Sequence, residues 1–174
     1  MMFSLISFKT PEICTISPKE PCLIMRIFDI LKYIKYQQVM NSSNKILAPI
    51  SVGELIDKIT ILEIKIEKIQ DNNKQKFIKH ELESLNKLLA DINFSKDQKK
   101  TVNSLKDELN TANRKLWKIE DDIRHLESVK EFKEEFVELA RNVYLTNDKR
   151  ASLKQKLNQI TNSEIVEVKS YKKY

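Results

Sequence analysis

Apolar residues recur at alternating steps of three and four along four segments of the chain after residue 50. This spacing keeps one stripe of side chains on one side of an α-helix and forms the heptad seam of helices that pack lengthwise. It predicts helices over residues 51–70, 74–93 and 95–129, and a fourth from Phe132 to Ile160. The seams of the first two helices are Leu55, Ile59, Leu62, Ile66 and Ile69, then Ile78, Leu82, Leu85, Leu89 and Ile92.

The third segment has the longest unbroken seam, and the fourth stays in phase across two polar positions. Thr146 and Arg150 both occupy seam positions of the fourth segment. Because the period continues through them, we predict one continuous helix with a polar layer rather than two helices. The two seams are Val102, Leu105, Leu109, Ala112, Leu116, Ile119, Ile123 and Leu126, then Phe132, Phe136, Leu139, Val143, Thr146, Arg150, Leu153, Leu157 and Ile160.

Capping signals and short polar breaks separate the segments. Ser51 with Glu54, and Ser95 with Gln98, have the spacing of a capping box at the start of a helix. Because the connections are short, neighbouring helices should run antiparallel. At 1.5 Å per residue the first two helices would be about 30 Å long and the last two about 45–50 Å, so the second hairpin should project beyond the first.

The predicted fold class is therefore all-α, an antiparallel helical bundle of long hairpins with coiled-coil-like heptad seams. Short β-prone segments, residues 45–48 and 165–168, should meet at one end of the bundle. Terminal β-pairing between them is an option that Pro49 confines to a sheet edge. Composition supports a helical fold, because Gly53 is the one glycine and all four prolines lie in the first 49 residues. Folds with many tight turns and glycine-rich phosphate loops are excluded on this basis.

The chain divides into an N-terminal extension, residues 1–45, and a single helical domain, residues 46–174. The extension is expected to be poorly ordered or to contain an amphipathic helix over residues 23–36, whose apolar stripe has Arg26, Lys32 and Lys35 largely off it. Such a basic helix could lie on a membrane surface, or it could dock on the helical domain.

The charge distribution and the cysteines indicate which kinds of partner and which cellular compartment to expect. The net charge of +6 is spread thinly, with six basic and three acidic residues in 1–45, and Glu alternates with Lys along the helices. This pattern does not favour nucleic-acid binding, which needs basic residues gathered on one face. Cys14 and Cys22 have no spacing that favours a structural disulfide, and no signal peptide or membrane span is apparent, so we expect a reduced, cytoplasmic protein.

The candidate chemistry is sparse. The two histidines, His80 and His125, lack the Glu-x-x-His spacing of a di-iron bundle, and the cysteines lack zinc spacing. We expect no metal, no cofactor and no catalytic residue, and we favour a protein that is not an enzyme.

The polar layer of the two long helices is the one informative anomaly. Folding the third helix onto the fourth pairs residues whose numbers sum to about 260, which puts Glu120 beside Arg141 and Asn113 beside Asn147. A buried Arg150 needs a partner, and the first helix offers Glu63 or Glu67 at that height. The layer could fix helix register, or Arg124, Arg141 and Arg150 could bind a carboxylate or phosphate. The candidate ligand-binding residues are Glu63, Trp117, Glu120, Asp121, Arg124, Arg141, Tyr144, Asn147, Asp148 and Arg150.

Four blocks of the sequence resemble a family of small uncharacterised helical proteins from bacteria and viruses. They are Ala48–Lys65 (APISVGELIDKITILEIK), Leu116–Arg124 (LWKIEDDIR), Ala140–Ala151 (ARNVYLTNDKRA) and Lys169–Tyr171 (KSY). The resemblance covers about residues 46–174 and implies a helical domain of unknown function, with no catalytic residue to transfer. Members typically start near Met40, which marks residues 1–39 as an extension.

Three hypotheses of function follow. The first is a non-enzymatic interaction or scaffolding module that binds a protein partner or self-associates through the exposed part of the long hairpin. The second is a protein that binds a small anion, or an enzyme acting on one, through the polar layer. The third is a peripheral membrane or nucleic-acid contact through residues 23–36 and the tail Lys169–Tyr174.

Overall fold

The computed structural model describes residues 46–170 and confirms an all-α fold. The chain divides into two compact units, residues 1–47 and 48–174, and the second unit holds all of the described helices. The sequence-predicted amphipathic helix at residues 23–36 lies outside the described residues. The helices are α2 (Val52–Lys68), α3 (Asn72–Ala90), α4 (Lys96–Ser128) and α5 (Glu134–Ile160).

Polar side chains start three of the helices, as the sequence predicts for two of them. The Ser51 hydroxyl accepts a hydrogen bond from the Glu54 amide at 3.1 Å, and Ser95 with Gln98 forms a complete capping box. The Asp71 carboxylate caps α3 by accepting from the amides of Asn73 and Lys74. These bonds satisfy amides that would otherwise have no partner within the helix.

Two predicted boundaries were wrong by a few residues. Helix α3 ends at Ala90 and not at Asn93, because the amides of Ile92 and Phe94 turn back to form tight-turn hydrogen bonds with the carbonyls of Leu89 and Ile92. Helix α5 begins at Glu134, so Phe132 lies in the preceding turn and is half-exposed at 52%. The predicted continuity of the fourth helix is confirmed, since α5 passes through Thr146 unbroken and buries it.

Helix α2 is the centre of the arrangement and is buried on opposite sides. Leu55, Ile59 and Leu62 lie along one side, and Gly53, Ile56, Asp57, Thr60 and Ile64 lie along the other. Helix α2 contacts α3, α4 and α5. Among the described helices, α3 lies along α2 alone. Helix α3 therefore covers one side of α2, and the α4–α5 hairpin covers the other.

The largest hydrophobic core lies where α2 crosses the α4–α5 hairpin. Its buried members come from all three helices, and Val52, Leu89, Phe94 and Ile160 pack against it. All but one of the predicted seam residues of α4 are buried, Ile123 being half-buried. The buried core residues are Ile56, Val102, Leu105, Leu109, Ala112, Leu153 and Leu157.

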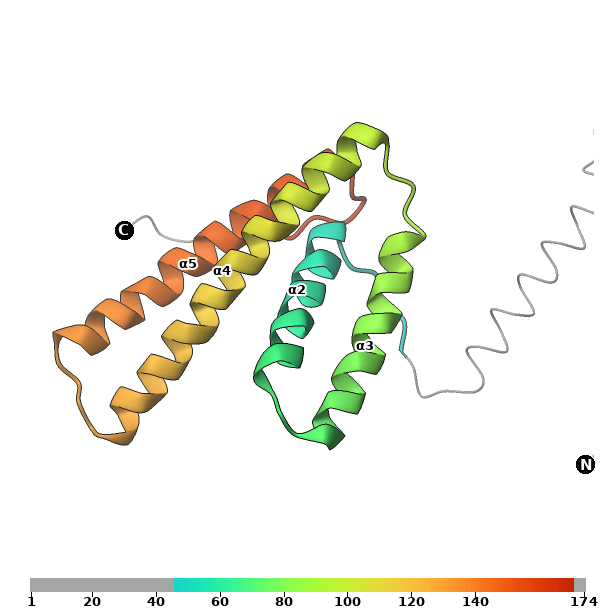
Figure 1. Ribbon diagram of the computed structural model, residues 1–174. Coiled ribbons are helices and arrows are strands. Elements are labelled where there is room, and N and C mark those ends of the chain that lie inside the picture. The colour runs from blue at the N-terminus through green and yellow to red at the C-terminus, as the bar shows by residue number, and fades with distance from the viewer. Residues whose placement is uncertain (1–45, 171–174) are drawn as a thin grey trace, which may run out of the picture. The chain divides into compact units, whose positions relative to one another are not determined.

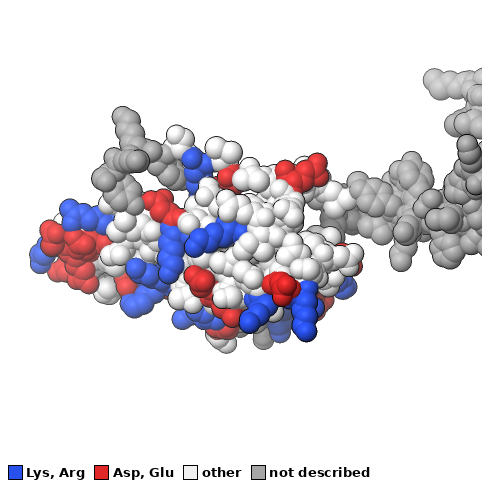
Figure 2. Space-filling model, turned by 90° about the horizontal axis from the view of Figure 1, so that it is seen from above, with Lys and Arg blue, Asp and Glu red and all other residues white. Residues whose placement is uncertain are grey.

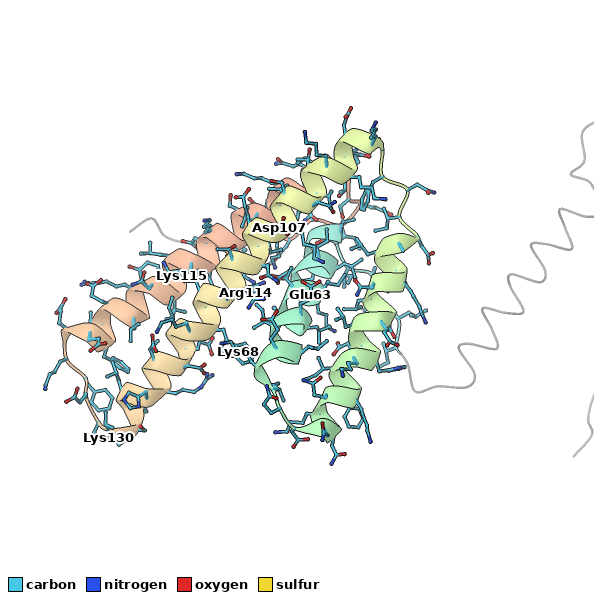
Figure 3. The ribbon with its side chains drawn as sticks, in the orientation of Figure 1. Glu63, Lys68, Asp107, Arg114, Lys115 and Lys130 are labelled. Carbon is cyan, nitrogen blue, oxygen red and sulfur yellow. The ribbon has the colours of Figure 1, made fainter. Side chains whose placement is uncertain are left out.

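The α4–α5 hairpin projects beyond the α2–α3 hairpin, as helix lengths predict (Figure 1). Helix α4 has 33 residues and α2 has 17, which correspond to about 50 Å and 26 Å. Lys68 marks the C-terminal end of α2, and Lys130 marks the turn of the long hairpin, well away from it (Figure 3).

The predicted terminal β-pairing does not form, because residues 46–170 contain no strand. Side chains, instead of a backbone ladder, hold the end of α5 and the residues after it to the start of α2. The Ser163 hydroxyl accepts from the Val52 amide at 3.2 Å and donates to the Ile165 carbonyl, while Glu167 pairs with Lys154 at 2.7 Å. These contacts confirm that the start of the first helix and the end of the fourth lie together.

Candidate functional site

A buried polar cluster joins the two hairpins. The carboxylate of Asp57 on α2 is fully buried and accepts hydrogen bonds from Arg150 Nε at 2.9 Å and Asn113 Nδ2 at 2.8 Å. Arg150 Nη2 donates to the second oxygen of Asp57, and Asn113 also donates to the Thr60 hydroxyl at 2.9 Å. The hydrogen bonds that Arg150 donates to Asp57 raise the pKa of its guanidinium and burial lowers it, and the net effect is a raised pKa. The guanidinium of Arg150 therefore stays positively charged.

The prediction that Glu63 or Glu67 would pair with Arg150 was wrong. Glu63 binds Lys106 at 2.7 Å, and Glu67 binds Arg114 through two hydrogen bonds. Both carboxylates lie further along α2, which crosses from α5 at its start to α4 at its end. Position along the bundle alone therefore selected residues on a different face of α2 from the one that meets Arg150.

Sequence reasoning missed Asp57, Thr60 and Lys154 as members of the polar interior. A usable signal was present, because Gly53, Asp57, Thr60 and Ile64 step by four, three and four and so form a second stripe beside the leucine–isoleucine seam. A glycine, an acid and a hydroxyl along one stripe of a helix indicate a polar contact face.

The contact between α2 and α5 is unusually close at Gly53. Its amide donates to Asn158 Oδ1 at 2.7 Å, and a Cβ at this position would lie 2.5 Å from the Lys154 carbonyl oxygen. The same turn of α5 buries Lys154, whose ammonium binds Glu54 and Glu167, each at 2.7 Å. Burial lowers the pKa of Lys154, but the hydrogen bonds that its ammonium donates to Glu167 and Glu54 outweigh this effect, so the net pKa is raised.

A surface pocket of about 300 Å³ lies beside this cluster, where α2 leaves α5 and passes over α4. We call it the notch. Its floor is apolar and includes Ile64, Leu116 and Trp117. The polar side chains around it are Asn113, Glu120, Asp121, Arg124, Asn147 and Arg150.

The notch brings together six of the ten sequence-predicted ligand residues: Trp117, Glu120, Asp121, Arg124, Asn147 and Arg150. The other four, Glu63, Arg141, Tyr144 and Asp148, do not line it. Arg141 binds Glu138 on its own helix, and Glu120 binds Arg124 at 2.7 Å, so the expected Glu120–Arg141 neighbours are each paired locally.

The electrostatics of the notch do not favour an anion. Two cationic groups line it, but Arg150 is committed to Asp57 and Arg124 to Glu120. Asp121 adds a further negative charge. Counting Asp57 beneath the surface, the acids outnumber the bases by three to two, so a phosphate or carboxylate would meet no uncompensated cation.

An apolar surface of α5 continues from the notch toward the hairpin turn. Arg150, Lys154 and Asn158 are the α5 residues that bond to α2. Steps of seven residues from these three lead to positions on the same side of the helix, drifting slowly around it. The apolar residues reached in this way form what we call the hairpin face: Phe136, Val137, Ala140, Val143 and Tyr144.

The hairpin face is incompletely covered because α2 ends before reaching it. Phe136 and Val143 are only half-buried and Ala140 is exposed. On the same side where α2 packs, Lys154, Leu157 and Asn158 are buried. Phe132, in the turn, meets Phe136 edge-on with ring centroids 5.2 Å apart.

The projecting end is acidic in a basic protein. Residues 119–145 carry eight acidic and four basic side chains, a net charge of −4, while the whole chain carries +6. Acidic side chains gather at the left end of the molecule in Figure 2, where the hairpin turn lies. The end therefore attracts basic groups and repels a second copy of itself.

The described residues contain no group of three or more His, Cys, Asp or Glu side chains that could hold a metal ion. None of the helices from α2 to α5 combines the length and apolarity needed to cross a bilayer.

Together these features define a class of all-α proteins built from two crossed helical hairpins, a short one and a long projecting one, tied by a buried ion pair. Within this class the chain belongs to the family of unknown function DUF6165, which it matches over residues 46–174. No curated protein and no solved structure matches the chain.

Proposed function

We propose that this protein is a non-enzymatic interaction module that binds an amphipathic helix of another protein on the hairpin face. The bound helix would lie along α5 beyond the notch. It would cover the part of α5 that α2 does not reach. The observation that carries this proposal is the contrast in burial along a single helix, α5, on the side that faces α2.

The apolar content of the hairpin face supports a helical occupant. Phe136, Ala140 and Val143 recur at spacings of four and three, which is the pattern that an amphipathic helix buries. Ala140 at the centre is small and exposed, so another backbone could approach closely there. Helix α2 already uses the equivalent side of α5 one to two heptads away.

Charge favours a separate protein over a second copy. Two hairpin ends brought face to face would each carry a net charge of −4, and like charges across an interface are unfavourable. The small-anion alternative has less support, because both arginines of the notch are already paired.

Two finer features belong to the same proposal. The eight-position heptad seam of α4 supports coiled-coil packing between α4 and α5. A cytoplasmic location is supported by Cys14 and Cys22, whose spacing gives no reason for a structural disulfide.

Peptide binding to the full chain tests the proposal. The probes are three 18-residue amphipathic helices that share one leucine stripe and carry basic, neutral or acidic residues on the flanks. The fluorescence of Trp117, the one tryptophan of the chain, reports binding because this residue lies where the hairpin face begins. We expect at least one peptide to bind, and binding of none of them would overturn the proposed function.

Ala140→Lys and Leu145→Lys form a matched pair of variants. Both place a lysine at an exposed position of α5, but Leu145 lies on the side of the helix away from α2. We expect Ala140→Lys to weaken peptide binding at least tenfold and Leu145→Lys to leave it within twofold. Equal effects would show that the peptide binds elsewhere.

A photocrosslinking residue at position 140 identifies the occupant. A crosslink to the added peptide supports the proposal. A crosslink to a second copy, or to residues 1–45 of the same chain, would overturn it by assigning the hairpin face to that occupant.

A further inference from the structure

We infer that the notch is an anchor pocket for one basic side chain, an arginine or lysine, of the helix that binds the hairpin face. This inference rests on the proposed function and names the chemistry of the partner at one position. The notch opens between the end of the α2–α5 contact and the start of the hairpin face, so a helix on that face would place one end beside it.

The shape and lining of the notch suit a long side chain with a charged tip. A volume of about 300 Å³ exceeds what one side chain needs, which leaves room for its hydration. Ile64, Leu116 and Trp117 offer apolar surface to the methylene stem. The half-buried indole of Trp117 can also attract a cation over its ring.

Asp121 is the acceptor that is least committed within the notch. Its carboxylate lies 4.0 Å from Arg124 Nη1, whereas Glu120 binds the same arginine at 2.7 Å. Arg124 is therefore held mainly by Glu120. The Asp121 carboxylate is 62% exposed and remains accessible to an incoming cation.

The two arginines of the notch do not prevent this use. Arg150 directs Nε and Nη2 at Asp57 and is held in place by that buried carboxylate. Its charge is compensated on the side away from the notch. Asn147 Oδ1, 3.4 Å from Arg150 Nη1, adds a polar acceptor to the wall. A guanidinium or ammonium entering the notch thus meets the Asp121 carboxylate as its acceptor.

Peptides that differ at one residue test the inference on the full chain. The neutral amphipathic helix carries arginine, citrulline or glutamate at one end of its leucine stripe, and a second set carries the same residues at the other end, which covers both helix directions. We expect the arginine peptide of one set to bind at least threefold more tightly than its citrulline twin. The preference should shrink as salt rises from 50 to 500 mM, because the contact is partly exposed.

Asp121→Asn and Asp122→Asn supply the matched variants. Asp122 is the next residue on α4, but it binds Lys118 and does not line the notch. Asp121→Asn should abolish the preference for arginine over citrulline and leave the affinity of the citrulline peptide unchanged, whereas Asp122→Asn should keep the preference.

The outcomes separate this inference from the proposed function. Equal binding of the arginine, citrulline and glutamate peptides, with binding still lost in Ala140→Lys, would overturn the anchor pocket while the hairpin face stands. A preference for arginine that survives Asp121→Asn would also overturn it. Absence of binding by every peptide would overturn the proposed function itself.

Discussion

Arg150 on α5 donates hydrogen bonds from Nε and Nη2 to the carboxylate of Asp57 on α2, which lies 93 residues away in the sequence. Asp57 is fully buried and is shared with Asn113 of α4, so one carboxylate connects three helices. A polar contact of this kind is satisfied in only one alignment of the helices, and we interpret it as the device that fixes where α2 crosses the long hairpin.

Replacing Asp57 by alanine should therefore be strongly destabilising. The substitution leaves the guanidinium of Arg150 without its charged acceptor and removes one of the two acceptors of the Asn113 amide, which typically costs about 3–5 kcal/mol. Urea denaturation followed by circular dichroism measures the loss. Glu120→Ala, which breaks an exposed ion pair with Arg124, is the control and should cost less than about 1 kcal/mol. Equal small losses in the two variants would refute the role given to Asp57.

Gly53→Ala should destabilise the protein although it introduces a better helix former. Alanine normally gains about 1 kcal/mol over glycine in a helix interior, and less in the first turn, where Gly53 lies. Here its Cβ would meet the Lys154 carbonyl oxygen at 2.5 Å and Asn158 Oδ1 at 2.8 Å, so α2 and α5 must separate. We expect a net loss of about 1–3 kcal/mol in unfolding free energy.

The control for Gly53→Ala is Ser104→Ala, at an exposed position of α4. This variant should be neutral or slightly stabilising, because alanine has the higher helix propensity and meets no neighbour. A stabilised Gly53→Ala would mean that the helices are further apart than described.

Leu109→Ala tests the location of the core. Leu109 is fully buried where α2, α4 and α5 meet, so its truncation should cost about 2–5 kcal/mol. Leu88→Ala removes the same atoms from a half-exposed position of α3 and should cost less than about 1 kcal/mol. Thermal or urea unfolding of both variants measures the difference, and similar costs would contradict the assignment of the core.

Acid should weaken the attachment of the C-terminal segment to the helices. The hydrogen bond from Lys154, together with the charge of Lys169, lowers the pKa of Glu167 below its ordinary value of 4.5. A lowered folded-state pKa means that this stabilisation is present above about pH 4.5 and is lost as the pH falls through the folded-state pKa. Glu167 is 42% exposed, so the contribution should be below about 1 kcal/mol.

Glu167→Gln provides the measurement for this pH dependence. The variant should be slightly less stable than the parent at pH 7, and the difference should shrink as the pH falls below 4.5 and Glu167 becomes protonated. A difference between the two proteins that stays constant from pH 7 to pH 3 would show that the ion pair does not contribute.

Local patterns in the sequence predicted the helices and most of their ends. Steps of three and four residues bury one side of a helix whatever lies opposite, and side-chain caps act within four residues of the chain. The seam of α4 and the caps at Ser51 and Ser95 are of this kind. The continuity of α5 through Thr146 was also predictable, because the heptad spacing of the apolar residues stays in phase on both sides of it.

The partner of Arg150, the close approach at Gly53 and the notch could not be read in the same way. Each depends on the angle and height at which α2 crosses the long hairpin, and helix periodicity says nothing about either. Glu63 and Asp57 lie within two turns of one helix, yet the crossing angle gives one to Lys106 and the other to Arg150. The sequence by itself thus determined which residues form helices and which sides are apolar. Only the tertiary structure decided which polar groups meet, because such contacts depend on the packing of elements far apart in the chain.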